Sequence, residues 1–112
     1  MRLPHADRAI IDIAKLRDYS LNPLHPEGKH KARVFAATMG LSVADAEKLQ
    51  AMILTTISSA EATEGVADEH GERFVVHFAT QGLRGIVTIR TAWIVDRGEI
   101  VPRLVSCYVK RK

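Results

Sequence analysis

Apolar residues recur at helical spacing in residues 29–39, where Ala32, Phe35 and Met39 stand at positions i, i+3 and i+7. This spacing places the three side chains on one face of a helix, which is the face that we expect to be buried. Gly40 follows the last of them and fits a left-handed C-terminal stop. The pattern therefore predicts a helix over this range that ends at Gly40.

Two further helices are predicted around this one. Asp12 can cap a short helix over residues 13–20, because its carboxylate can accept hydrogen bonds from the free amides of the first turn. Ser42 and Asp45 form an approximate capping box at the start of a longer apolar series. That series predicts a third helix running to about residue 62, followed by an exposed loop over residues 63–71.

The second half of the chain changes to strand-like alternation and is rich in β-branched and aromatic residues. Turns with glycine, at residues 81–85 and 96–99, separate its apolar runs. We predict three strands, over residues 73–79, 86–95 and 104–109. Because connections this short join antiparallel neighbours, the strands form a meander.

Alternation gives each strand an apolar face and a mixed face. In the middle strand Arg90 projects opposite Trp93, which we expect in the core. In the last strand, strict alternation places Leu104 on the same face as Ser106 and Tyr108. The whole pattern indicates one α+β domain over residues 1–112, with N-terminal helices packed on one face of a three- to four-stranded antiparallel sheet. Its helical part covers about 1–62 and its strand part about 72–110.

Composition is that of an ordinary globular protein, with 46% hydrophobic and 26% charged residues in a chain of 112. The single cysteine, Cys107, excludes an internal disulfide framework and is expected to pack inside a strand. No apolar run has the length of a membrane span, and the N-terminus has no signal-peptide pattern. A cytoplasmic protein without membrane association is therefore expected.

The net charge of +3 hides an uneven distribution. Residues 1–40 carry seven Lys/Arg and four Asp/Glu, residues 41–72 carry one and seven, and residues 73–112 carry eight and two. If the two basic segments meet in the fold, they form a surface that attracts phosphates. The alternative, bases scattered over the surface, is left open by the sequence.

The densest group of reactive side chains lies in the turn before the second helix. His25, Lys29, His30, Lys31 and Arg33 fall within nine residues. Histidine suits general acid/base work near neutral pH, and cations stabilise a phosphate that gains charge. These are the groups of a metal-independent ribonuclease, in which the RNA supplies its own 2′-hydroxyl nucleophile. The plainer interpretation is a solvated basic turn whose histidines cap or pack.

The predicted strands offer a second set of polar side chains. Ser106 and Tyr108 share a face, and a tyrosine hydroxyl can donate to a phosphate oxygen. The full set is His77, Arg90, Thr91, Arg103, Ser106 and Tyr108. The ribonuclease interpretation assigns His25 or His30 as acid/base, Lys31 and Arg90 as phosphate clamps, and Ser106 or Tyr108 as supporting donors. Substrate-binding roles are assigned to Lys29, Arg33, Thr91 and Arg103.

A metal site is the weaker interpretation. His25 and His30 are five residues apart, whereas a helical ligand pair prefers a spacing of four. Cys107 lies far from both in sequence and has no second cysteine beside it. No metal and no cofactor is expected.

Three segments carry a resemblance to a known family. They run from Leu16 to Phe35, from Thr91 to Ile94 and from Pro102 to Tyr108. They resemble a small bacterial toxin-like family with the signature KLxxYxLNPxHPxGxHKAxxF, followed by TAWI and PRLxSCY. The motif positions are His25, Gly28, His30, Lys31, Thr91, Trp93, Arg103, Ser106 and Tyr108. The order of helices and strands is also similar to ribonuclease toxins of the barnase, EndoU, colicin and RelE type.

The resemblance implies an RNA-cleaving toxin of a bacterial toxin–antitoxin pair, with RNA (tRNA or mRNA) as substrate and a small neutralising protein as partner. A homodimer is left open. A second hypothesis from a different class is a non-catalytic binding module, such as an antitoxin, immunity protein or adaptor, whose acidic residues 41–72 contact a basic partner. A third, an enzyme acting on a small anionic substrate, has no glycine-rich nucleotide loop to support it.

Overall fold

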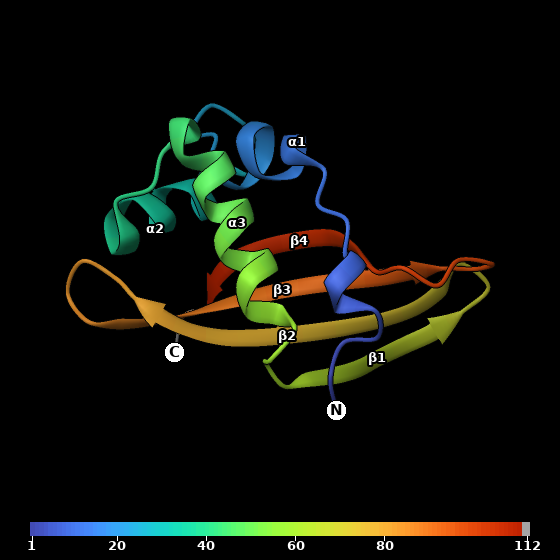
Figure 1. Ribbon diagram of the computed structural model, residues 1–112. Helices are drawn as coiled ribbons and strands as arrows, with labels where there is room; N and C mark the ends of the chain where they lie inside the picture. The colour runs from blue at the N-terminus through green and yellow to red at the C-terminus, as the bar shows by residue number, and fades with distance from the viewer. Residues whose placement is uncertain (111–112) are drawn as a thin grey trace.

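The computed structural model describes residues 1–110 and has three helices above one antiparallel sheet (Figure 1). A single 3₁₀ turn, η1 (Ala6–Arg8), precedes the first helix. The sheet has four strands in the order β1-β2-β3-β4, so β1 and β4 are its two edges. The predicted α+β class and the placement of the helices on one face of the sheet are confirmed.

The first helix begins as predicted, with the Asp12 carboxylate accepting a hydrogen bond from Ala14 N (3.0 Å). It consists of a short α1 (Ile13–Lys15) and a wider π-helical turn, η2 (Leu16–Ser20). In this turn Leu21 N donates to Leu16 O, five residues back. The π turn places Leu16 and Ser20 inside the core.

The second helix, α2 (Lys29–Met39), has the predicted bounds and ends at Gly40, whose φ of 68° lies in the left-handed region. Ser42 and Asp45 form the expected capping box, at a 3₁₀ turn, η3 (Val43–Asp45). This turn continues into α3 (Ala46–Ile57). The helix ends earlier than residue 62, because residues beyond it turn toward the sheet.

The strands are β1 (Ala62–Asp68), β2 (Gly71–Gln81), β3 (Ile86–Asp96) and β4 (Arg103–Lys110). The exposed loop predicted over residues 63–71 is wrong, because most of it is β1. This edge strand buries only Ala62. A strand that is exposed on both faces leaves no alternating pattern of apolar residues in the sequence.

A β-bulge corrects the predicted faces of the last strand. Trp93 pairs with Leu104, but its neighbour Ala92 pairs with Ser106, so Val105 is the extra residue. The insertion moves Leu104 to the helix-covered face, away from Ser106 and Tyr108. Strict alternation could not anticipate this, since a bulge resets the period of two.

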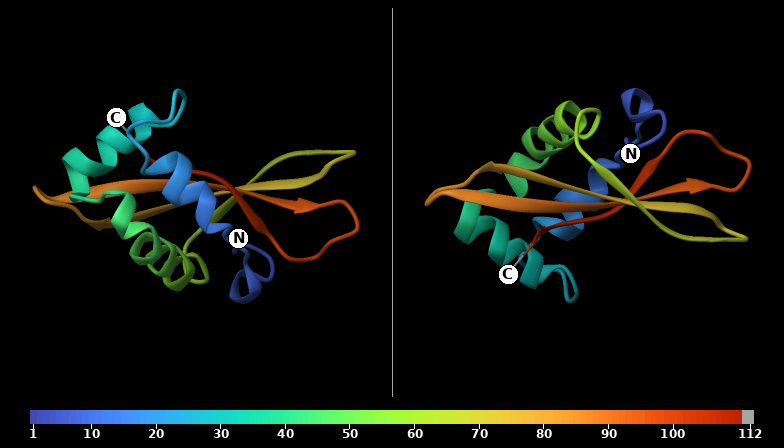
Figure 2. Two further views of the ribbon diagram at one scale, coloured as in Figure 1. Left: turned by 90° about the horizontal axis from the view of Figure 1, so that it is seen from above. Right: turned by 90° about the horizontal axis from the view of Figure 1, so that it is seen from below.

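One hydrophobic core fills the space between the helices and the sheet. Trp93, Phe74 and Cys107 are buried in it, as expected. Figure 2 shows the helices from above and the sheet from below. The sheet contributes Phe74, Val76, Phe78, Ile89, Thr91, Trp93, Leu104, Cys107 and Val109 to this core. The other face of the sheet, which we call the open face, carries the polar side chains of the same strands.

Candidate functional site

His25 caps the turn that leads into α2. Its Nδ1 accepts hydrogen bonds from Glu27 N (3.0 Å) and Gly28 N (2.9 Å), and its backbone oxygen accepts from Lys29 N (3.0 Å). Pro26 follows directly and lies in the turn before α2, which begins at Lys29. An Nδ1 that accepts carries no proton, so the ring proton sits on Nε2. The structure therefore gives His25 a structural role in the motif HPxG.

Gly28 and Asn22 complete this turn. A Cβ on Gly28 would lie 2.2 Å from the backbone oxygen of Tyr19, so any larger residue would collide with main chain. The Asn22 side chain accepts from Leu24 N (2.9 Å) and donates to Asp18 O (3.3 Å). Much of the signature thus serves to fold the segment between η2 and α2.

The TAWI segment is also structural. The Thr91 hydroxyl donates to Val76 O (3.0 Å) and accepts from Trp93 Nε1 (2.8 Å). Thr91 is fully buried on the helix-covered face. It therefore contacts no surface ligand, and the substrate-binding role expected for it is not supported.

Three polar side chains line up across the open face. In the strand register His77 on β2 lies opposite Arg90 on β3, and Arg90 lies opposite Tyr108 on β4. The Arg90 guanidinium carbon is 5.5 Å from the centroid of the Tyr108 ring. Since neighbouring strands are about 4.8 Å apart, this row spans about 10 Å of sheet. We call His77, Arg90 and Tyr108 the open-face row.

Lys31 connects α2 to this row. Its Nζ lies 5.4 Å from the centroid of the Tyr108 ring and 4.9 Å from that of Tyr19. Tyr19 in turn meets His25 edge-on, with the ring centroids 4.5 Å apart. Lys31 is thus the point where the first basic segment of the chain meets the last one. For these residues, the convergence that the sequence left open is present.

Within residues 1–110, no carboxylate forms an ion pair with the cations at this place. The five ion pairs among residues 1–110 involve none of Lys31, Arg90 and Lys110. Partial burial, together with the charges of Lys110 and Arg90, lowers the pKa of His77. His77 is therefore neutral at pH 7 and able to accept a proton. The acidic strand β1 lies at the opposite edge of the sheet.

Two hollows flank Lys31 along the edge strand β4. We call the first, of about 510 Å³, the Tyr19 hollow; Lys15, Tyr19, Lys31 and Ser106 are among the residues that line it. We call the second, of about 520 Å³, the Tyr108 hollow; its lining includes His30, Lys31, Arg33, Tyr108 and Lys110. The structure thus brings His30, Lys31, Ser106 and Tyr108 to one edge, as the ribonuclease hypothesis requires.

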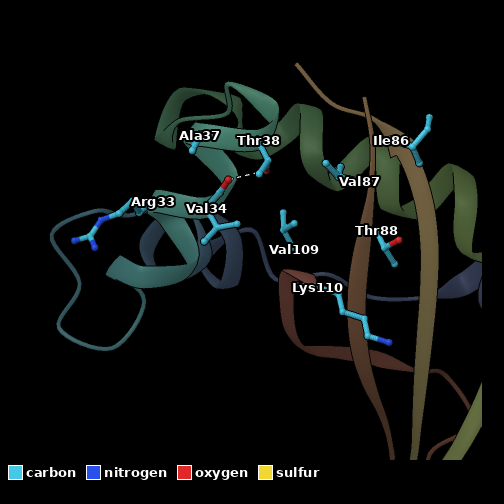
Figure 3. A pocket seen from close by; sticks show the side chains of 9 residues that line it. All are labelled: Arg33, Val34, Ala37, Thr38, Ile86, Val87, Thr88, Val109 and Lys110. Atoms are coloured by element: carbon cyan, nitrogen blue, oxygen red, sulfur yellow. Dashed lines mark hydrogen bonds between the residues drawn. The ribbon is translucent and has the colours of Figure 1, made fainter. Parts of the chain in front are cut away.

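A third hollow, of about 630 Å³, continues from the second between α2 and the ends of β3 and β4. Figure 3 shows Val34, Val87 and Val109 in its apolar part. Arg33 and Lys110 stand on its rim and point away from one another (Figure 3). The third hollow therefore shares its two cations with the Tyr108 hollow and is otherwise lined, within residues 1–110, by uncharged residues.

Two predicted substrate-binding residues lie elsewhere. Arg103, at the other end of β4, forms a bidentate ion pair with Asp96 (2.7 and 3.0 Å), which lowers the pKa of that carboxyl. Lys29 lines a separate hollow of about 430 Å³ between α2 and the segment around Ser42. His77, in contrast, joins the site, and its position on the polar face of a strand was the signal in the sequence.

Within residues 1–110, no group of three His, Cys, Asp or Glu side chains is arranged to hold a metal ion. None of the helices in that range is long and apolar enough to cross a membrane.

Fold and surface together define a small α+β domain with a basic, tyrosine-containing edge opposite an acidic one. The chain belongs to the DUF6883 family, described as a domain of unknown function, whose model matches residues 2–111. No curated protein matches the chain, and no solved structure matches it.

Proposed function

We propose that this protein is a metal-independent endoribonuclease whose active site is the open-face row together with Lys31. The observation that carries the proposal is that the charged groups of Lys31 and Arg90 both lie within 5.5 Å of the Tyr108 ring centroid, while His77 lies opposite Arg90 in the strand register. A neutral imidazole beside unpaired cations combines a proton acceptor with phosphate-binding groups.

In this mechanism His77 takes the proton of the 2′-hydroxyl next to the scissile phosphate. The 2′-oxygen forms a bond to phosphorus, and the bond from phosphorus to the 5′-oxygen breaks. Lys31 and Arg90 bind the phosphate as its charge rises, and the Tyr108 hydroxyl gives its proton to the departing 5′-oxygen. The products are a 2′,3′-cyclic phosphate and a 5′-hydroxyl end. His30, which lines the Tyr108 hollow, remains the second acid/base residue to be tested.

The biological role that fits is the toxin of a bacterial toxin–antitoxin pair, acting in the cytoplasm where its RNA substrate is. A neutralising partner would have to cover the basic edge along β4. The alternative, a non-catalytic binding module, is favoured by one observation, the acidic edge strand β1 with six of its seven residues exposed. That strand offers a surface for a basic protein.

The direct test is incubation of purified protein with a defined RNA, with and without chelator. We expect cleavage that survives the chelator and leaves 2′,3′-cyclic phosphate ends. His77→Ala, Lys31→Ala and Tyr108→Phe should each lower the rate, and a general acid/base residue contributes about 10²–10⁴-fold. His70→Ala is the matched control, because His70 is exposed near the acidic edge and away from the row.

Expression in a host without the partner tests the toxin role. Growth should stop with the natural protein and continue with the folded His77→Ala, Lys31→Ala double variant. Growth arrest by that double variant, or no RNA cleavage by a folded natural protein that binds a basic partner, would favour the binding module.

A further inference from the structure

The two hollows along β4 differ in the charged residues that line them, and RNA cleavage alone does not require this difference. The Tyr19 hollow mixes opposite charges, since Lys15 and Lys31 share it with the carboxylates of Asp12, which caps α1, and Asp18, which is paired with Arg17. The Tyr108 hollow contains the cations Lys31, Arg33 and Lys110, and none of the residues within 1–110 that line it carries a carboxylate. Lys31 belongs to both hollows.

The mixed hollow suits a nucleobase better than a phosphate. Carboxylates repel phosphate oxygens, and the Asp12 oxygen that does not cap α1 can accept a hydrogen bond from an amino or imino group of a base. The Ser106 hydroxyl adds a group that can donate or accept. Tyr19 is half-buried there, with Lys31 Nζ 4.9 Å from its ring centroid, so a base stacks on this ring by displacing the ammonium group. Loss of such a stacked contact weakens binding by about fivefold or more.

The Tyr108 hollow, whose charged lining residues within 1–110 are all basic, suits the RNA backbone. Arg33 on α2 and Lys110 at the end of β4 are both exposed residues of its lining, and their side chains point away from one another at its rim (Figure 3). Neither takes part in an ion pair with another residue of the described range 1–110. Both are thus available to phosphate oxygens.

We propose that this edge binds single-stranded RNA across the cleavage point, with one unstacked base in the Tyr19 hollow and the following phosphates in the Tyr108 hollow. The proposal rests on the proposed function only in placing the scissile phosphate at Lys31, between the two hollows. A base can enter a hollow only after leaving its stack, and an A-form duplex keeps its bases stacked. Single strands, loops and bulges are therefore the substrate class.

Binding can be measured without cleavage. The probe is a fluorescein-labelled ten-nucleotide RNA with 2′-fluoro groups throughout, which lacks the 2′-hydroxyl nucleophile. It is used alone and annealed to its complement, and affinity is read by fluorescence anisotropy at several salt concentrations. We expect the single strand to bind at least tenfold more tightly than the duplex.

Two kinds of variant separate the roles of the hollows. The Arg33→Ala, Lys110→Ala double variant should weaken binding and reduce the slope of log affinity against log salt by about 1.4, because each single-strand phosphate contact contributes about 0.7. Tyr19→Leu should weaken binding about fivefold or more with the slope unchanged, whereas Tyr19→Phe keeps the ring and the affinity. Arg97→Ala, in the turn before β4, is the control for a surface charge.

Equal affinity for strand and duplex, or variants that bind like Arg97→Ala, would overturn the proposal. The proposal would also be overturned if polyglutamate displaced the labelled RNA as well as unlabelled RNA does, independently of Tyr19. The edge would then be a general binding site for anions or acidic proteins. Tight, Tyr19-dependent binding without cleavage of unmodified RNA would instead contradict the proposed function alone. Cleavage that none of the hollow variants affects would contradict this binding mode alone.

Discussion

The Nδ1 atom of His25 accepts a hydrogen bond from the backbone N–H of Gly28 at 2.9 Å. This contact assigns the most conspicuous histidine of the sequence to the start of a helix. The acid/base role expected for His25 passes, in our proposal, to His77 on the open face. The motif from Leu16 to Phe35 therefore contains both the HPxG turn, which helps the segment fold, and Lys31, a residue of the proposed site.

Replacing His25 tests the folding role. His25→Ala removes the acceptor for two backbone amides of the turn, and loss of such a hydrogen bond costs about 1 kcal/mol. His25→Asn, which can accept from the same amides, should recover most of this loss. Urea unfolding followed by circular dichroism gives both values. Equal stability of the alanine and natural proteins would contradict the capping role.

Thr91 gives a second test of a structural motif position. Thr91→Val keeps the shape of the side chain but leaves the buried Trp93 N–H without its acceptor, which costs about 1–3 kcal/mol. Thr91→Ser keeps the hydroxyl and should lose less. Trp93 is the only tryptophan in the chain, so its fluorescence during unfolding measures the effect directly. A valine variant as stable as the serine variant would argue against the hydrogen bond.

The cysteine should be unreactive in the folded protein. Burial raises the pKa of the Cys107 thiol from 9.0 to about 12. A thiol-specific aromatic disulfide at pH 8 should therefore label Cys107 only after unfolding. The unfolded chain ionises first, so this group favours the folded state below pH 9 and loses that effect as the pH rises toward 12. Rapid labelling of the native protein would contradict the buried thiol.

The hydrophobic pattern predicted the helices and strands that bury one face against the core. It missed the strand that buries no face. The Ala32, Phe35, Met39 stripe defined α2 to the residue, whereas β1 was missed because it buries only Ala62. The bulge at Val105 left no trace in the alternation of β4.

The candidate site was predicted in part for a similar reason. The sequence grouped Lys31 with His25 because the two residues lie close together along the chain. The partners that Lys31 meets, Tyr19 and Tyr108, are twelve residues away and on the last strand, and only the pairing of helix and sheet brings them together. Side-chain hydrogen bonds such as that of His25 also depend on a turn geometry that residue type alone does not specify.

The pH dependence of cleavage should follow His77. Its pKa is lowered first by partial burial and then by the positive charges of Lys110 and Arg90, so the neutral form persists below pH 6.5, the ordinary value. The rate constant kcat/KM should fall only when the pH drops through that lowered pKa. Lys110→Ala removes one of the two positive charges, so the pKa of His77 should rise and the acid limb of the kcat/KM profile should move toward higher pH. Partial burial of the imidazole should still keep this pKa below 6.5. Lys29→Ala, on the far side of α2, should leave the limb in place.

The same shift can be followed without substrate, because the imidazole resonances of His77 report its titration by NMR. A Lys110→Ala variant in which His77 titrates as in the natural protein would remove the electrostatic link between β2 and β4. If His77 titrates as expected but the acid limb of cleavage does not move with it, the proton is accepted by another group, and His30, across the Tyr108 hollow, becomes the residue to replace.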